Sequence, residues 1–410
     1  MRAGRVFFFD PALGAAGGHH ATVAANYRRL LHGARAVRFV GHVGAEVEHP
    51  LFRHRLDDAF RVSRYGVAWV GDRRLARLAQ WGAGLRNGAR ALPAAEGLGR
   101  ARSRLSAADY CALFSGLGAG EALDAFFASA APGRDDDVVC LGVDPAVLAA
   151  LVARRALFQG GPRLHLLFMY PEEDFVTAAT CEAYWALARE AASFSAHVFA
   201  EFEAHAAQLR SALGCAVSVQ MTPVRLAPLP PPPNEPFVVT ALGAGRGDKA
   251  FDRLPAVAAE TEARDAAVRF QIQAPARHAG LRAPLKALER MRNVQMLPAE
   301  LTDEAYERAL TEARVVLLAY DQARYRTRGS GVLVDALIGG RPAIVTKGTA
   351  LAEAASPDAM LTGADAPSFA EAIVAMRADY ARFADAAAKG AACALRTLKD
   401  GPLLQALRGA

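Results

Sequence analysis

Short apolar runs rich in β-branched and aromatic residues recur along the chain, separated by longer Ala- and Leu-rich stretches with a helical period. This alternation predicts βα units around parallel sheets. In the first half we expect strands at Val6–Asp10, Ala36–His42, Asp137–Val143, Leu164–Tyr170, Val198–Phe202 and Val217–Thr222. The stretch Ala76–Arg104, rich in Ala, Gly and Arg, is interpreted as helix and loop.

A proline-rich segment divides this pattern into two series of strands. Residues Pro228–Pro236 include four consecutive prolines, which cannot donate ladder hydrogen bonds and favour a stiff, extended chain. The second series is expected at Phe237–Leu242, Val268–Gln273, Val294–Leu297, Val315–Tyr320, Ala343–Thr346 and Met360–Leu361. We therefore expect two α/β domains, residues 1–228 and about 235–385, with a ligand-binding cleft between them.

The composition agrees with two globular domains in a reducing compartment. The chain has 410 residues, of which 52% are hydrophobic and 22% are charged, as sizeable cores require. The five cysteines are scattered and form no Cys-x-x-Cys pair, which argues against disulfides and a zinc site and for the cytoplasm. No apolar run approaches the ~20 residues of a spanning helix, and the run at Phe7–Phe9 is too short for a signal peptide.

Charge and glycine spacing narrow the ligand classes. The net charge of +6 is spread along the chain without a Lys/Arg block, so nucleic acid is not expected as a partner, whereas a nucleotide diphosphate or an anionic membrane surface is left open. The segment after the first strand lacks the Gly-x-Gly-x-x-Gly spacing, which disfavours a dinucleotide-binding dehydrogenase.

The segment Tyr320–Thr346 predicts a strand, a basic loop, a helix and a further strand. Ser330 is a plausible N-cap, and Gly339-Gly340 ends the helix. Free N–H groups at such a helix N-terminus suit a diphosphate. Asp335, four to five residues inside the helix, is placed to accept hydrogen bonds from the hydroxyls of a ribose. The alternative is that Ser330 only caps the helix and Asp335 is a surface acid.

A second motif follows the strand expected at Phe237–Leu242. It is a glycine-rich turn that begins at Gly243 and carries Arg246 and Lys249 before a helix. Glycines let the backbone approach a ligand closely, and two cations can neutralise a leaving diphosphate. We expect neither cation to have a structural partner within the motif; the alternative is that both are solvated turn residues.

Two loops of the first half supply weaker candidates. Gly17, Gly18, His19 and His20 follow the first strand, where a histidine can contact a donor phosphate, polarise an acceptor hydroxyl or act as a base. Adjacent side chains point in different directions, so one histidine is expected to face the cleft and the pair can equally be a solvated surface feature. Residues Tyr170, Glu172 and Glu173 end another strand and are candidates for the acceptor side, or simply the acidic start of a helix.

The stretch from Arg328 to Thr346 resembles the donor-binding segment of glycosyltransferase family 4 and its bacterial relatives. Thr327 falls near the place of the first glutamate of that family, Asp335 stands for the second, and Ala250 replaces the glycine after the lysine. The resemblance implies a GT-B fold, two Rossmann-like domains with parallel sheets facing each other across a cleft. It also implies a nucleotide-diphospho-sugar donor, no cofactor, no obligatory metal and retention at the anomeric carbon. The implied donor-binding residues are Gly17, Gly18, Gly243, Arg246, Lys249, Tyr325, Arg328, Gly329, Ser330, Gly331, Val332 and Asp335.

The sequence is thus interpreted as that of a hexosyltransferase-type glycosyltransferase in surface polysaccharide or glycoconjugate synthesis. His19, His20, Arg246 and Lys249 are its candidate catalytic residues. The expected partners are the nucleotide-sugar and a saccharide, lipid-linked or protein acceptor; peripheral association with the inner membrane and homo-oligomers are left open. Residues 386–410 are expected to pack back on the first domain, as in the resembled family. The rival hypotheses are a nucleotide-sugar 2-epimerase of the same fold and a degenerate, non-catalytic binding or scaffold protein.

Overall fold

The computed structural model describes residues 4–10, 13, 19–42, 56–60, 119–143, 145–174, 178–243, 245–275, 279–354 and 358–409. The chain forms two compact units. The first comprises Met1–Glu201, His205–Gln220 and Asp400–Ala410, and the second comprises Phe202–Ala204 and Met221–Lys399. The unit boundary thus falls at Gln220, eight residues before the boundary expected at 228, and the segment Ala76–Arg104 lies outside the described residues.

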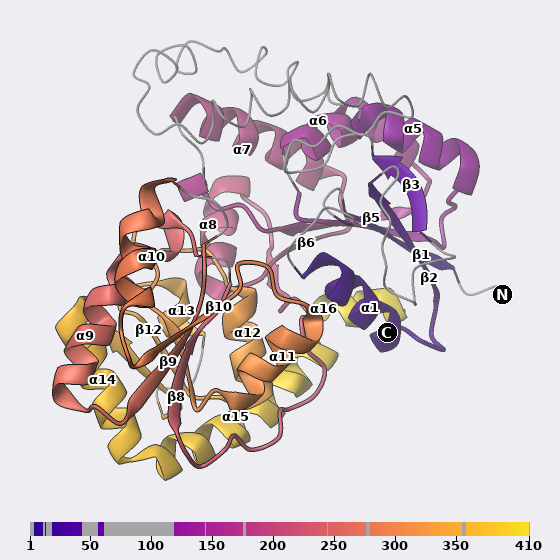
Figure 1. The fold of residues 1–410 in the computed structure, drawn as a ribbon. Helices are drawn as coiled ribbons and strands as arrows, with labels where there is room; N and C mark the ends of the chain where they lie inside the picture. The colour runs from indigo at the N-terminus through magenta and orange to yellow at the C-terminus, as the bar shows by residue number, and fades with distance from the viewer. Residues whose placement is uncertain are drawn as a thin grey trace, which may run out of the picture. The chain divides into compact units, whose positions relative to one another are not determined.

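The first unit contains a seven-stranded parallel sheet in the order β3-β2-β1-β4-β5-β6-β7 (Figure 1). The strands are β1 Arg5–Phe9, β2 Ala36–His42, β3 Leu56–Phe60, β4 Asp137–Leu141, β5 Arg163–Phe168, β6 His197–Ala200 and β7 Ser218–Val219. The sequence pattern missed β3, because its Leu-Asp-Asp-Ala-Phe sequence has neither an apolar run nor alternation. The strands expected at Val198–Phe202 and Val217–Thr222 are shorter than predicted.

Helices of the first unit connect these strands. They are α1 His20–Leu30, α5 Ala119–Ala130, α6 Pro145–Ala153, α7 Ala178–Ser193, α8 Glu203–Leu213 and α16 Pro402–Arg408, with 3₁₀ turns at Arg155–Phe158 and Glu172–Asp174. Alternation along β1 sends Phe7 and Phe9 to one face, against Phe126, and Phe8 to the other face, against Tyr27. Burying these aromatic rings on both faces fixes the sheet between two helical layers.

The final helix belongs to the first unit. The Arg35 guanidinium donates to the carbonyl of Leu407 at 3.0 Å, and Arg408 donates to the carbonyl of Leu30 at 3.2 Å. These contacts tie α16 to the residues around the end of α1, and Figure 1 shows the two helices side by side. The helix before it, α15, remains in the second unit.

The second unit contains a six-stranded parallel sheet in the order β10-β9-β8-β11-β12-β13. The strands are β8 Phe237–Ala241, β9 Val268–Gln273, β10 Val294–Leu297, β11 Val315–Leu318, β12 Ala343–Thr346 and β13 Met360–Gly363. The helices are α9 Leu254–Arg264, α10 Arg282–Glu289, α11 Asp303–Glu312, α12 Gly331–Gly339, α13 Ala350–Glu353, α14 Ala366–Ala378 and α15 Tyr380–Lys399, with 3₁₀ turns at Gly247–Lys249, Phe251–Arg253 and Ala279–Leu281. The prediction of a two-domain α/β fold is therefore confirmed.

The strand orders show where ligand sites belong. In the second sheet the chain moves outward from β8 through β9 to β10 and then returns to place β11 on the other side of β8. Such a reversal opens a crevice at the carboxyl ends of the two central strands, where ligands bind in open α/β sheets. The first sheet reverses in the same way at β1, which lies between β2 and β4. No helix among the described residues has the length and apolarity needed to cross a membrane.

Candidate functional site

Helix α12 begins at the reversal point of the second sheet. Ser330 is its N-cap in an extended conformation, and the Ser330 hydroxyl accepts the Leu333 N–H at 3.4 Å, so the predicted cap is confirmed. Among the described residues, no protein group accepts the N–H of Gly331 or Val332, both in the first turn. Gly340, with φ of 70°, ends the helix in the left-handed conformation. The N-terminus of α12 therefore offers two N–H groups and a positive dipole end to an anion.

The glycine-rich turn after β8 lies against this helix start. Gly243 has φ of 86°, and a Cβ atom there would clash with the Lys249 Nζ and lie 3.2 Å from the Val332 Cγ2. Only glycine combines this backbone conformation with so close an approach to α12. The Gly243 N–H donates to Gln273 Oε1 at 2.7 Å, so the end of β9 fixes the turn. Gln273 was not predicted as a site residue, although a polar residue at the end of a strand that alternates apolar and polar positions was an available signal.

Three basic side chains gather around one carboxylate at this point. Both guanidinium groups of the cluster pair with Asp248, Arg246 through Nη2–Oδ2 at 3.2 Å and Arg328 through Nη1–Oδ2 at 3.5 Å. The Asp248 carbonyl accepts the N–H of Asp321, which joins the turn after β8 to the loop after β11. The expectation that the cations lack a partner within the motif is therefore wrong for Arg246, which Asp248 holds, and for Lys249, whose Nζ donates to the Gly243 carbonyl. One carboxylate against three basic groups still leaves excess positive charge.

Lys249 is the innermost cation of this cluster. Its Nζ donates to the Gly243 carbonyl at 2.7 Å and lies 5.5 Å from the centre of the Tyr320 ring. Loss of hydration lowers the pKa of Lys249 to about 7, Arg246 and Arg328 act in the same direction, and Asp248 opposes them. A diphosphate beside this ammonium would reverse the shift, because a nearby negative charge favours the protonated form.

The basic loop between β11 and α12 is held by aromatic residues. Tyr325 is buried, its ring centre lies 4.5 Å from that of Tyr320, and the Arg328 guanidinium lies 5.5 Å from the Tyr325 ring. Burial raises the pKa of Tyr325 to about 12, so its hydroxyl stays neutral near pH 7. Gly329 and Ser330 then lead into α12. Tyr325 thus supports Arg328 from within the fold.

Asp335 lies in the second turn of α12 and is buried, so it is not the surface acid of the alternative interpretation. Its Oδ2 accepts the Tyr306 hydroxyl at 2.9 Å, and its Oδ1 lies 3.3 Å from Arg225 Nε. Arg225 also pairs with Glu307. The sequence could not reveal these partners, because they come from α11 and from the segment before β8. A ribose contact would have to use a lone pair that these donors leave.

At the carboxyl end of β1 the structure brings together an acid and a histidine. The His20 Nδ1 lies 2.7 Å from the Asp10 Oδ2, and the Asp10 side chain is almost completely buried. Asp10 extends the ladder by donating its N–H to the Val40 carbonyl, while His20 is the first residue of α1. His19 is the N-cap of that helix and makes no side-chain cap hydrogen bond. Asp10 was not predicted as a site residue, although its place at the strand end was a signal.

The remaining candidate residues of the first unit are Gly17, Gly18, Tyr170, Glu172 and Glu173. Gly17 and Gly18 lie outside the described residues. Glu172 and Glu173 form part of a 3₁₀ turn after β5, and α7 is Ala178–Ser193. Tyr170 is half-buried against the core of the first unit. The part of the chain that the structure describes contains no group of three His, Cys, Asp or Glu side chains able to hold a metal ion.

Solved structures share this fold over the whole chain. Sucrose-phosphate synthase from Thermosynechococcus elongatus matches with a TM-score of 0.64 and 14% identity, covering 99% of this chain and 97% of that one. HepE from Anabaena, in complex with UDP, matches with a TM-score of 0.60 and 14% identity over 99% and 100% of the two chains. The lipopolysaccharide outer core galactosyltransferase WaaB matches with a TM-score of 0.58 and 12% identity over 99% of each chain.

Other matched structures are longer, and the chain spans only 57 to 59% of their length. No family model matches the sequence, and no curated protein matches it. At these identities the likeness shows the fold, which is the GT-B fold of glycosyltransferases, as the sequence resemblance implied.

Proposed function

We propose that this chain is a glycosyltransferase that moves a sugar from a UDP-sugar to an acceptor hydroxyl. The observation that carries the proposal is the cluster of Arg246, Lys249 and Arg328 beside the open first turn of α12, at the reversal point of the second sheet. A helix N-terminus and three basic groups are an arrangement that binds a diphosphate. The choice of UDP draws support from the structural neighbour HepE, which was solved with UDP and with UDP-glucose.

The chemistry follows from where charge develops. As the bond between the sugar and the diphosphate breaks, negative charge grows on the leaving oxygen. Lys249 and Arg246 are held by Gly243 and Asp248 and can stabilise that charge without rearranging. We infer that no metal is needed for this step, because the side chains supply the positive charge. We also propose that the transfer retains the anomeric configuration, with the protein supplying position and charge stabilisation.

The first unit would supply the acceptor side. We propose that His20 contacts the reacting hydroxyl, because its Nδ1 is held by buried Asp10 and its Nε2 is left to polarise a hydroxyl or take its proton. The acceptor we favour is a saccharide in the synthesis of a surface polysaccharide or glycoconjugate. The structural neighbour WaaB, a lipopolysaccharide galactosyltransferase, supports this context.

A donor panel tests the proposal. The purified chain is incubated with UDP-, GDP- and dTDP-sugars in EDTA, with and without saccharide acceptors, and release of the nucleoside diphosphate is measured. We expect release to need an acceptor and UDP-sugars to be preferred. An epimerase would instead convert the donor without an acceptor, and a scaffold protein would release nothing. If UDP, GDP and dTDP all fail to bind in calorimetry, the assignment of the diphosphate site is wrong.

A further inference from the structure

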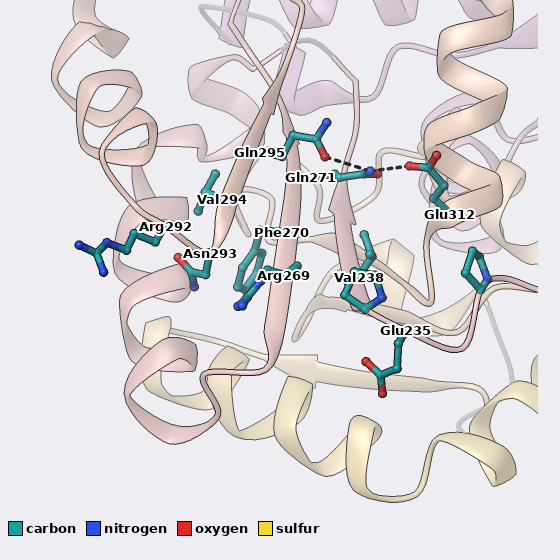
Figure 2. A pocket seen from close by; sticks show the side chains of 12 residues that line it. Glu235, Val238, Arg269, Phe270, Gln271, Arg292, Asn293, Val294, Gln295 and Glu312 are labelled. Carbon is teal, nitrogen blue, oxygen red and sulfur yellow. Dashed lines mark hydrogen bonds between the residues drawn. The ribbon is translucent and has the colours of Figure 1, made fainter.

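The second unit carries a pocket of about 500 Å³ at the amino ends of β8, β9 and β10 (Figure 2). Its volume falls within the ~300–1,000 Å³ of small-molecule sites. The lining comes from these strands, the segment before β8 and the end of α11, all within the second unit. Val238 in the pocket and Gly243 in the diphosphate site are five residues apart along the chain, or roughly 16 Å of extended strand. The pocket is therefore separate from the diphosphate site.

The sheet face that lines the pocket is unusually polar for its position. Along β9, Val268, Phe270 and Ile272 pack into the core, so alternation sends Arg269, Gln271 and Gln273 to the opposite face. Strands of parallel sheets are usually apolar on both faces, because helices cover both. Gln273 has a structural role, since it holds Gly243 and donates to the Ala299 carbonyl. Among the described residues, Gln271 makes no hydrogen bond to the turn at Gly243, and packing of the core does not explain why this position is polar.

Gln271 is the centre of a row of polar groups. It lies in register between Thr240 of β8 and Gln295 of β10. Its Nε2 donates to Glu312 Oε2 at 2.7 Å and to Gln295 Oε1 at 3.4 Å, and its Oε1 accepts the Thr240 hydroxyl at 3.4 Å. Figure 2 shows Gln295, Gln271 and Glu312 in line above Val238. Because Gln271 is buried and has these partners, it fixes the orientation of both neighbours.

This row leaves a donor on one side of Gln271 and an acceptor on the other. Within the described ranges no protein group bonds to Gln295 Nε2 or to Glu312 Oε1. A hydroxyl group both donates and accepts, so two hydroxyls of one sugar match this pair. Apolar wall is supplied by Pro233, Pro236 and Val238, which suits the C–H face of a sugar ring. The charged lining residues balance in sign: Arg269, Arg292, Glu235 and Glu312.

We propose that this pocket binds a neutral saccharide, with Gln295 and Glu312 hydrogen bonding to its hydroxyls. A phosphate or nucleotide fits less well, because the carboxylates oppose it and the arginines have no excess. The site does not rest on the proposed transferase function. On that function it would hold a longer acceptor or product chain away from the reacting hydroxyl and raise the effective concentration of that chain.

Binding of small neutral sugars to pocket variants tests the proposal. Maltotriose, cellotriose and chitotriose are titrated against the full chain by saturation-transfer NMR, with uridine and UDP as comparison ligands. The variants are Gln295→Ala, Glu312→Ala and their double variant. The matched control is Gln159→Ala with Glu289→Ala, at two exposed positions outside the pocket. Lys249→Met reports on the diphosphate site. Melting curves accompany every variant, and Gln295→Ala, at an exposed position, serves alone if Glu312→Ala fails to fold.

We expect at least one trisaccharide to bind the wild type, each single variant to weaken it roughly three- to tenfold, and the control and Lys249→Met to leave it unchanged. UDP binding should be the same in wild type and pocket variants. The proposal is overturned if no trisaccharide binds the wild type, or if the double variant binds the trisaccharide as well as the wild type does. It is also overturned if UDP or Lys249→Met abolishes trisaccharide binding, or if the double variant loses binding of uridine instead. Failure of UDP to bind would contradict the proposed function and leave this test unaffected.

Discussion

The ends of β1 and β8 occupy equivalent places in their sheets, yet they carry different chemistry. Each strand lies where its sheet reverses order. At β1 a buried carboxylate holds one imidazole, with the His20 Nδ1 2.7 Å from the Asp10 Oδ2. At β8 two arginines pair with Asp248 and Lys249 donates to the Gly243 carbonyl, so the basic groups outnumber the carboxylate. The topology of the sheet thus decides where a site can form. The side chains at that place decide whether the site can move a proton or bind an anion.

The largest effect should come from removing charge at β8. Lys249→Met should lower turnover ~10²- to 10³-fold, because Lys249 would stabilise charge that grows in the transition state. Turnover with a UDP-sugar and its best acceptor is measured. Lys286→Met, at an exposed position of α10, removes the same charge outside the site and should have no effect. Turnover that is equal in Lys249→Met and wild type would contradict the role of this cluster.

A smaller loss is expected at β1. His20→Ala should lower turnover at least ~10-fold, a modest share of what a positioned acid or base contributes. Asp10→Asn should lower it in the same direction, because the amide no longer favours the same imidazole orientation. The pH profile of kcat/KM should change in both variants. His32→Ala removes an exposed histidine after the end of α1 and is the control. If Asp10→Asn retains the wild-type profile, the pair is structural only.

The affinity for UDP should depend on pH through Lys249, at the end of β8. The pKa of Lys249 is about 7 in the free protein, so above pH 7 binding must take up a proton. We expect the dissociation constant for UDP to rise by up to ~10-fold per pH unit above pH 7, and Lys249→Arg to flatten this slope.

The same lowered pKa affects stability, because lysine in the unfolded chain titrates near ~10.4. The unfolded chain therefore binds more protons between these values, and without UDP the free energy of unfolding should rise with pH there. Calorimetry at several pH values measures the dissociation constant, and denaturant titrations measure the free energy of unfolding. An affinity for UDP that does not change with pH would contradict the lowered pKa of Lys249.

The smallest effect concerns Asp335, which lies in α12 and not at the end of β1 or β8. Asp335→Asn should lower the free energy of unfolding by ~1–3 kcal/mol, because Arg225 and Tyr306 lose their buried acceptor charge. Asp252→Asn, at an exposed position, is the control in denaturant titrations. UDP affinity is measured on the same samples. Affinity equal to wild type would limit Asp335 to the fold, and a clear loss would support the ribose contact that the sequence suggested.

Much of the second sheet was predictable because its strands are local features of the sequence. The expected ranges Val268–Gln273, Val294–Leu297 and Ala343–Thr346 agree with the structure at both ends. Their apolar residues and flanking turns need no tertiary information. In contrast, β3 with its two aspartates is a strand because β2 offers it a partner in register. Pairing with a neighbouring strand of the sheet overrides local propensity.

The sequence alone determined most of the elements, the N-cap at Ser330 and the residue types at each strand end, because these depend on neighbours within a few positions along the chain. Only the tertiary structure decided how those residues are used. It paired Asp10 with His20, placed Asp248 between two arginines, buried Asp335 against Tyr306, and set Gln271 between Thr240 and Gln295. Most of these contacts join residues from separate elements, and hydrogen bonds depend on distances and angles that only the packed sheets and helices fix.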